Sequence, residues 1–419
     1  MSLYKLITRS TGKAFGQNIL LTHDTTEFIH HSVQRTIYNS NKVLCENKGK
    51  PEESPLKKLL DDSASFEDLK IKNEEQRWAT LPYPQEAKIR KQGEYFAEKP
   101  KQDPRETSII LFPGQGSQFV GMTKELMKFP MARDLFELAN YILKYDLLKL
   151  CQEGPKEKLD QTQYCQPAIM VSSLAAIERL KEERPNAILN CTGTAGFSLG
   201  EITALVFAGA IGFERGLQLV KIRGEAMQLA SEAYQGGMVT VIYGPDSKLN
   251  QALLKAKEWA VDKGDLFPEC RIANYLYPHC KVVAGSISAL DYLEKNAKEY
   301  NLRRVKKLPV SGGFHSDLML PAVEPFRKAL NKTEIQDPVI SVYSNVDGKR
   351  YKNAAHIKKQ LPKQIVKPVK WEQTLHVIYE RTQDEYFPRT FECGPGSSLT
   401  TILKQVNTKA WSSCLHIGV

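Results

Sequence analysis

The run ILNCTGTAGFSLGE at residues 188–201 indicates the fold class, because it leads from a predicted strand through a glycine turn into a predicted helix. Residues from Ile188 to Ala195 can form the strand, and apolar residues then recur at helical spacing, at Ile202, Leu205 and Val206. A strand that enters a helix through a short turn is the repeating unit of parallel α/β folds. The turn itself contains the pattern G-x-S-x-G, with Ser198 at its centre.

This pattern between a strand and a helix is typical of a nucleophile elbow. Gly196 and Gly200 permit a tight turn that presents the hydroxyl of Ser198 at the start of the following helix. Free N–H groups and the helix dipole favour a developing oxyanion at that place. The N–H of Leu199 is the expected donor, and a purely structural glycine turn is the alternative interpretation of the pattern taken alone.

The segments on either side predict a larger α/β core. An apolar run at Ser108–Phe112 is broken by Pro113-Gly114-Gln115-Gly116, which predicts a strand followed by a turn. Helical patterns cover residues 166–184 and 213–233. This alternation predicts a large α/β-hydrolase-like domain with a parallel sheet.

The middle of the chain has a different order of predicted elements. It reads strand, helix, strand, strand, helix, strand, which is the ferredoxin-like order, over residues 238–243, 247–260, 271–275, 281–284, 287–300 and 305–309. We therefore predict a small ferredoxin-like domain over 237–308. It is inserted into the large domain, which is made of 106–236 and 309–410.

The N-terminal region differs in composition from the rest. No acidic residue precedes Asp24, whereas Lys5, Arg9 and Lys13 lie among hydroxyl-bearing and small apolar residues. This composition resembles a mitochondrial transit peptide, which we assign to residues 1–40. Residues 41–105 are polar and rich in Lys, Glu and Pro, and this predicts a flexible leader.

Composition excludes several other classes of protein. The 419 residues carry a formal net charge of +10, but the basic residues are scattered, which disfavours nucleic acid as a partner. No stretch approaches the ~18 apolar residues of a membrane span. The histidines and the eight cysteines show no metal-ligand spacing, so we expect no metal.

The elbow and several other motifs resemble one family. The run Gly196-Phe197-Ser198-Leu199-Gly200-Glu201 is similar to the nucleophile motif of the malonyl-CoA:acyl carrier protein transacylases, whose members usually have His at the position of Phe197. The resemblance extends from about Ile110 to about Leu403 and includes PGQGSQ at 113–118, SNVDG at 344–348 and ECGPG at 392–396.

The resemblance implies roles for residues outside the elbow. The backbone N–H of Gln115 would be the second oxyanion donor. By pattern alone Arg223, on an apolar helix face, suggests a salt bridge or a side chain that reaches water. The resemblance implies instead that its guanidinium binds the free carboxylate of malonate in two parallel hydrogen bonds.

The remaining implied roles concern the base and the substrate cleft. His315, in SGGFHSD at 311–317, would be the general base for Ser198. The backbone carbonyl of Gln364 would orient its ring, since Asp317 is too close in sequence to do so. Asn274 is expected to contact substrate.

The family resemblance implies a ping-pong transfer. Malonyl would pass from malonyl-CoA to Ser198 and then to the phosphopantetheine thiol of acyl carrier protein, feeding type II fatty acid synthesis in the mitochondrial matrix. We expect a monomer without a cofactor of its own. The alternatives are a serine thioesterase or esterase, which should have an acidic third member, and a non-catalytic paralogue that binds carrier protein.

Overall fold

The computed structural model describes residues 103–419. The transit-peptide-like segment predicted at 1–40 and residues 41–102 of the predicted leader lie outside the described residues. Residues 103–105 of that predicted leader are among the described residues. Asp103 caps a short 3-10 helix, η4 (Pro104–Glu106), by accepting a hydrogen bond of 2.9 Å from the N–H of Arg105.

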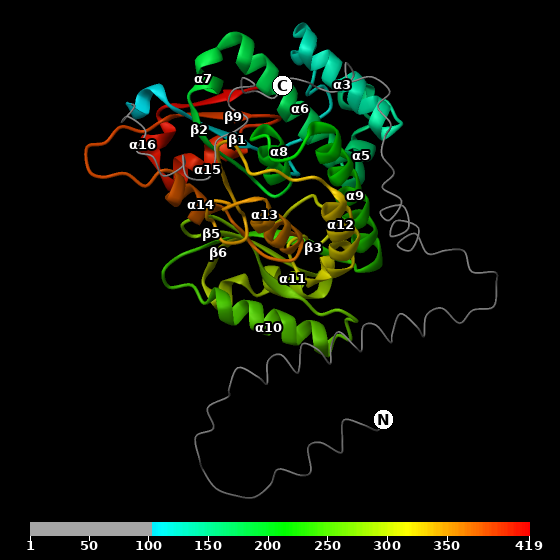
Figure 1. Ribbon diagram of the computed structural model, residues 1–419. Helices are drawn as coiled ribbons and strands as arrows, with labels where there is room; N and C mark the ends of the chain where they lie inside the picture. Colours follow the sequence, from blue (N-terminus) through cyan, green and yellow to red (C-terminus); the bar gives the residue numbers. More distant parts are fainter. Residues whose placement is uncertain (1–102) are drawn as a thin grey trace, which may run out of the picture. The chain divides into compact units, whose positions relative to one another are not determined.

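A parallel sheet of five strands forms the centre of the larger part (Figure 1), and the predicted parallel α/β fold is confirmed. The strand order is β10-β9-β1-β2-β7, and every neighbouring pair is parallel. The bounds are β1 (Ser108–Phe112), β2 (Cys191–Gly196), β7 (Ser341–Tyr343), β9 (Arg389–Cys393) and β10 (Cys414–Ile417).

One predicted boundary in this sheet is wrong. The sequence predicts Ile188 and Leu189 in the strand before the elbow, but they end a short helix, α7 (Pro185–Leu189), and β2 begins only at Cys191. Pro185 occupies the first turn of α7, where its fixed φ favours a helix and its missing N–H does no harm.

Long helices enclose this sheet. Helix α6 (Thr162–Glu183) is buried along most of its length and packs against α9 (Phe213–Ala233) and α3 (Pro130–Leu143). No helix among residues 103–419 is long and apolar enough to cross a membrane. The remaining helices of this part are α4 (Leu147–Glu153), α5 (Lys156–Leu159), α8 (Leu199–Phe207), α12 (Leu320–Lys332), α13 (Ala354–Gln360), α14 (Trp371–Ile378), α15 (Ser398–Val406) and α16 (Thr408–Trp411), with 3-10 turns η5 (Leu126–Lys128), η7 (Asp317–Met319) and η8 (Leu361–Ile365).

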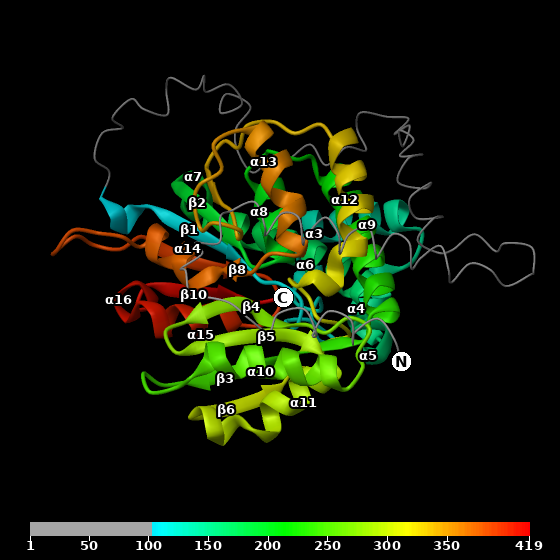
Figure 2. The ribbon, with the colours of Figure 1, turned by 90° about the horizontal axis from the view of Figure 1, so that it is seen from below.

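The second sheet has the order β6-β3-β5-β4-β8, with α10 (Leu249–Asp262) and α11 (Ile287–Lys295) packed on one side of it (Figure 2). Valines and leucines of the sheet and both helices form a separate core, including Val239, Val241, Val283, Leu253 and Leu293. The strand bounds are β3 (Gly236–Tyr243), β4 (Cys270–Tyr277), β5 (Cys280–Ser286), β6 (Leu302–Lys307) and β8 (Val369–Lys370), and η6 (Ala297–Tyr300) follows α11.

The fifth strand of this sheet comes from outside the predicted small domain. Strand β8 pairs in parallel with β4, where Asn274 lies opposite Val369. It follows η8, which contains Gln364, by only a few residues. The chain just after Gln364 is therefore held to the second sheet.

Two ion pairs also connect the second sheet to the rest of the fold. Lys281 on β5 contacts Glu372 on α14 at 2.6 Å, and both side chains are largely buried. Arg271 on β4 donates to Asp317 on η7, with an Nη1–Oδ1 distance of 3.0 Å.

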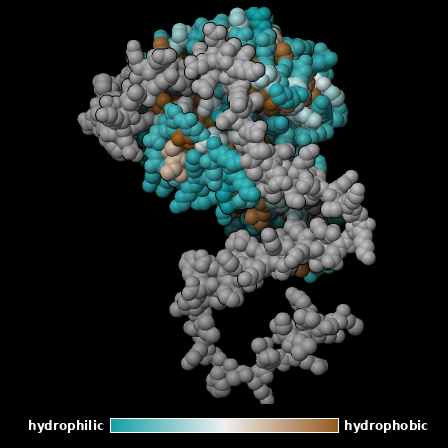
Figure 3. Space-filling view, turned by 45° about the vertical axis from the view of Figure 1, so that its right-hand side comes forward, coloured by the Kyte–Doolittle hydropathy of each residue, from teal (hydrophilic) through white to brown (hydrophobic). Residues whose placement is uncertain are grey.

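On the face seen in Figure 3, hydrophilic residues dominate the surface of the described part, and apolar residues occur in small groups.

Candidate active site

The turn between β2 and α8 has the sharp geometry of an elbow. Ser198 is the N-cap of α8 and has φ 53°, in the left-handed region. A Cβ on Gly196 would lie 1.8 Å from the carbonyl carbon of Gly200, and one on Gly114 would lie 2.4 Å from the carbonyl oxygen of Phe197. Only glycine fits at these two positions, so the loop carrying Gly114 packs directly on the elbow.

A buried asparagine holds the elbow from the other side. The N–H of Ser198 donates to Oδ1 of Asn345 at 2.7 Å, and Nδ2 of Asn345 donates to the carbonyl of Gly196 at 2.8 Å. Sequence reasoning treated residues 344–348 only as a fold signal and missed this role. The available signal was an asparagine that lies two positions after the short apolar run Val339–Tyr343.

His315 lies within hydrogen-bond distance of the serine hydroxyl. Its Nε2 is 2.8 Å from Oγ of Ser198, and its Nδ1 is 2.7 Å from the carbonyl oxygen of Gln364. Because a carbonyl can only accept, Nδ1 carries the proton and Nε2 presents its lone pair to the serine. This is the tautomer that a general base for Ser198 requires.

The surroundings of His315 keep its ring neutral. Burial and the positive charge of Arg223 together lower the pKa of His315 to about 4, although the hydrogen bonds of the ring with the backbone of Gln364 and Lys367 act in the opposite direction. The ring is only 3 % exposed. At pH 7 the lone pair on Nε2 is therefore available to accept a proton.

We expect the ring of His315 to stay uncharged as the pH is lowered from 8 to about 5, because its pKa is depressed to about 4. NMR titration of the histidine ring protons measures this, with the His315 signal assigned by its loss in His315→Gln. Arg223→Gln removes a positive charge and should raise the midpoint. A His315 midpoint near the ordinary value of about 6.5 in the wild type would contradict the expectation.

Arg223, on α9, is 1 % exposed and its guanidinium points at the serine. Its Nη2 is 3.2 Å from Oγ of Ser198 and 2.8 Å from Oε1 of Gln364, while Nη1 donates to Oε1 of Gln166 at 2.7 Å. These oxygens are all neutral, and Nε has no hydrogen-bond partner among the described residues. Burial lowers the pKa of Arg223 to about 10, although the charge of Glu201 opposes this.

Gln166 was not among the predicted site residues. It lies in a run of apolar residues on the buried helix α6, and a polar side chain at such a position needs a partner. A polar residue within this apolar run was therefore a signal that Gln166 binds another polar group. The sequence does not show which group, because the partner, Arg223, is 57 residues away in the chain.

Gln364 joins the parts of the site to one another. Besides its carbonyl contact to His315, its Nε2 donates to the carbonyl of Ser198 at 2.7 Å and to Oε2 of Glu201 at 2.6 Å. Burial raises the pKa of Glu201 to about 7, against the hydrogen bonds from Tyr351 and Gln364. Neither Glu201 nor Tyr351 was predicted as a site residue.

The two predicted oxyanion donors lie on the segments that meet at the elbow. Leu199 is the first residue of α8, so its N–H has no acceptor within the helix. Gln115 follows Gly114, which lies so near the carbonyl of Phe197 that a Cβ there would clash with it. The side chain of Gln115 donates to Oγ1 of Thr162 at 3.1 Å. Its backbone N–H, and not its side chain, is therefore the predicted oxyanion donor.

The other predicted residues have less direct relations to Ser198. Asn274 is 6 % exposed on β4, and its Oδ1 has no hydrogen-bond partner within the described part of the chain. Asp317 binds Arg271. The ring of Phe197 packs edge-on against Trp371, with centroids 5.5 Å apart, so this departure from the family motif supplies packing.

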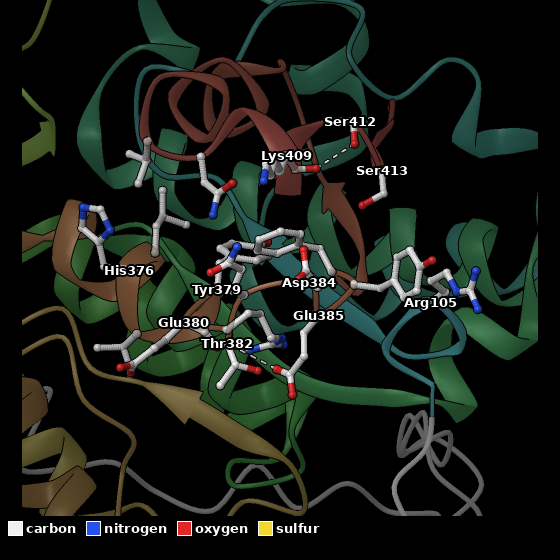
Figure 4. A pocket seen from close by; sticks show the side chains of 18 residues that line it. Arg105, His376, Tyr379, Glu380, Thr382, Asp384, Glu385, Lys409, Ser412 and Ser413 are labelled. Carbon is white, nitrogen blue, oxygen red and sulfur yellow. Dashed lines mark hydrogen bonds between the residues drawn. The ribbon is translucent and has the colours of Figure 1, made fainter.

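A cavity of about 1200 Å³ lies elsewhere, between the loop after α14 and the helix α16 (Figure 4). Basic and acidic side chains both line it, including Arg105, Arg381, Lys409, Glu380 and Glu385. None of the residues discussed above as part of the site lines this cavity. Its mixed charge favours no one class of ligand.

Within residues 103–419, no group of three or more His, Cys, Asp or Glu side chains could hold a metal ion.

Comparison with known proteins adds independent findings. The acyl transferase domain family matches residues 109–409. The chain is 60% identical over 319 residues to a probable mitochondrial malonyl-CoA-acyl carrier protein transacylase of Drosophila melanogaster, with 76% of this chain and 84% of that protein covered. It is 52% identical over 316 residues to the mitochondrial malonyl-CoA-acyl carrier protein transacylase of Homo sapiens, covering 75% and 81% of the two chains.

Solved structures give the same result. The malonyl CoA-acyl carrier protein transacylase of Coxiella burnetii superposes with a TM-score of 0.67 at 32% identity, covering 76% of this chain and 95% of that one. A malonyl-transacylase in complex with its type II PKS acyl-carrier protein superposes with a TM-score of 0.65 at 33% identity, covering 74% and 94%.

Proposed function

Because the chain belongs to the malonyl-CoA:acyl carrier protein transacylase family, we propose that it transfers malonyl from malonyl-CoA to the phosphopantetheine thiol of acyl carrier protein. The observation that carries this proposal is the contact of one serine hydroxyl with both a neutral histidine and a buried guanidinium. His315 supplies a base for Ser198, and Arg223 supplies a charge for a second carboxylate on the acyl group.

In the first half-reaction, Oγ of Ser198 attacks the thioester carbonyl carbon and its proton passes to Nε2 of His315. The N–H groups of Leu199 and Gln115 stabilise the oxyanion. The carbon–sulfur bond then breaks, the thiolate of coenzyme A takes the proton from His315, and malonyl remains as an ester on Ser198. The thiol of acyl carrier protein reverses these steps and accepts the malonyl group.

The position of Arg223 favours a short dicarboxylic acyl group. Its Nη2 lies 3.2 Å from the attacking oxygen, so a carboxylate bound there can be only about one methylene away from the carbonyl under attack. Malonyl has this length. Acetyl has no second carboxylate and would leave the guanidinium without an anionic partner.

The orienting group argues against the esterase alternative. An esterase of the α/β-hydrolase class has an acidic third member, whereas Nδ1 of His315 faces the carbonyl of Gln364. The carboxylate of the nearby Asp317 accepts hydrogen bonds from Arg271.

We assign the protein to mitochondria, because its relatives are named as mitochondrial. Within mitochondria we assign it to the matrix, because its N-terminal segment is basic and lacks acidic residues. We expect it to act as a monomer without a cofactor of its own.

Label transfer tests this function. The protein is incubated with malonyl-CoA labelled in the malonyl group and with the phosphopantetheine form of acyl carrier protein, and the products are separated. Label should appear on the carrier protein, with apo carrier protein lacking the thiol as the control. Label found only in free malonate would identify a thioesterase, and no loss of label from coenzyme A would support the non-catalytic paralogue.

A further inference from the structure

The orientation of one amide controls the part of the site that faces the acyl group. An amide side chain has nearly the same shape when its oxygen and nitrogen are exchanged, so its partners must select one orientation. In Gln364 the oxygen faces Nη2 of Arg223 at 2.8 Å, and the nitrogen faces the opposite way. The reverse orientation would point an NH₂ group at the guanidinium, where two donors would meet.

Two acceptors select this orientation, the carbonyl of Ser198 at 2.7 Å and a buried carboxylate. Oε2 of Glu201 accepts from Nε2 of Gln364 at 2.6 Å, and Glu201 is 0 % exposed. A carboxylate can only accept, so the NH₂ end of the amide must face it. The orientation also holds when Glu201 is protonated, since a proton on Oε1 faces the Tyr351 hydroxyl and leaves Oε2 as an acceptor.

The position of Glu201 is itself fixed. It lies in the first turn of α8, three residues after Ser198, and its N–H donates to the carbonyl of Ser198 at 3.1 Å. The hydroxyl of Tyr351 donates to its other oxygen. The carboxylate of Glu201, the amide of Gln364 and the guanidinium of Arg223 therefore form one chain of hydrogen bonds. This chain begins in the first turn of the helix after the nucleophile and ends at the guanidinium beside it.

We propose that Glu201, held by Tyr351, is a positioning residue that orients the Gln364 side chain and, through it, the guanidinium of Arg223 beside Ser198. This inference rests on the proposed function, since it concerns the acyl group that the site accepts. Loss of the acceptor at residue 201 leaves the carbonyl of Ser198 as the one remaining acceptor for Nε2 of Gln364, so the amide is held less firmly and its hydrogen bond with Arg223 is weakened. Malonyl transfer depends on Arg223, and acetyl transfer does not.

The test compares kcat/KM for malonyl-CoA and for acetyl-CoA in variants at this position. Glu201→Met keeps the approximate shape but removes the acceptor, and should lower the malonyl-to-acetyl ratio about tenfold, the effect of losing one hydrogen bond to a charged group. Glu201→Gln retains one oxygen acceptor and should recover most of the ratio. Tyr351→Phe leaves Glu201 less firmly held and should give a smaller decrease, of about threefold.

Glu392→Met is the matched control, because Glu392 is also 0 % exposed but its carboxylate accepts from Leu399 and Thr400 at the start of α15 and not from Gln364. It should lower the melting temperature and leave the ratio unchanged. A wild-type ratio in Glu201→Met, or in Tyr351→Phe if the former does not fold, would overturn the inference. Absence of malonyl transfer by the wild type would instead overturn the proposed function.

Discussion

Replacement of Ser198 by alanine should abolish the covalent malonyl adduct and lower transfer to acyl carrier protein by at least about 10,000-fold, as expected when the nucleophile of a cooperating set is removed. The physical reason is that Oγ of Ser198 is the atom that forms the ester bond to malonyl, and none of the neighbouring groups can replace it. His315 takes its proton, and Arg223 lies 3.2 Å from it. Without this oxygen no ester can form.

Intact-mass spectrometry after incubation with malonyl-CoA measures the adduct, and a coupled assay measures transfer. Ser108→Ala is a suitable control, because Ser108 is a buried, hydrogen-bonded serine in the same sheet whose hydroxyl donates to the carbonyl of Ala187. The control should retain the adduct. An unchanged adduct in Ser198→Ala would mean that another residue is the nucleophile.

Replacement of Arg223 by alanine should lower kcat/KM for malonyl-CoA by at least about 100-fold, which corresponds to the loss of two hydrogen bonds between charged groups. Use of acetyl-CoA should change far less, because acetyl has no carboxylate for the guanidinium to bind. A panel of acyl-CoA substrates measures both quantities in the same preparation.

Arg223→Lys provides a sharper comparison than alanine alone. Lysine keeps the positive charge but lacks the planar pair of donors, so it should restore only part of the malonyl activity. Equal losses for malonyl-CoA and acetyl-CoA in Arg223→Ala would refute the assigned role. They would show instead that Arg223 supports the elbow, where its Nη2 also contacts Ser198.

Features encoded within one short segment could be predicted from the sequence. The elbow, the parallel sheet and the order of elements in the second sheet follow from local patterns of glycine and apolar residues. The boundary at α7 was misjudged because Ile188 and Leu189 suit a buried strand and a buried helix equally well. Periodicity alone does not separate these two cases in a short apolar run.

Contacts between distant segments could not be predicted in the same way. Asn345 reaches Ser198 across 147 positions and Gln364 reaches Glu201 across 163 positions. Such residues look like ordinary polar side chains until the fold brings them together. His315, Arg223 and Gln364 were predicted only through the family motifs, since a lone histidine, arginine or glutamine carries no local signal of its partners.

The neutral surroundings of Arg223 have a consequence for how this chain can change over evolutionary time. A buried cation whose contacts are amide and hydroxyl oxygens weakens the fold, and an apolar side chain of similar volume there would be expected to strengthen it. Stability therefore gives no reason to keep Arg223, and selection for acyl transfer is what retains it. A gene copy released from acyl transfer should lose this arginine early, so its retention distinguishes a working transferase from a copy that only binds carrier protein.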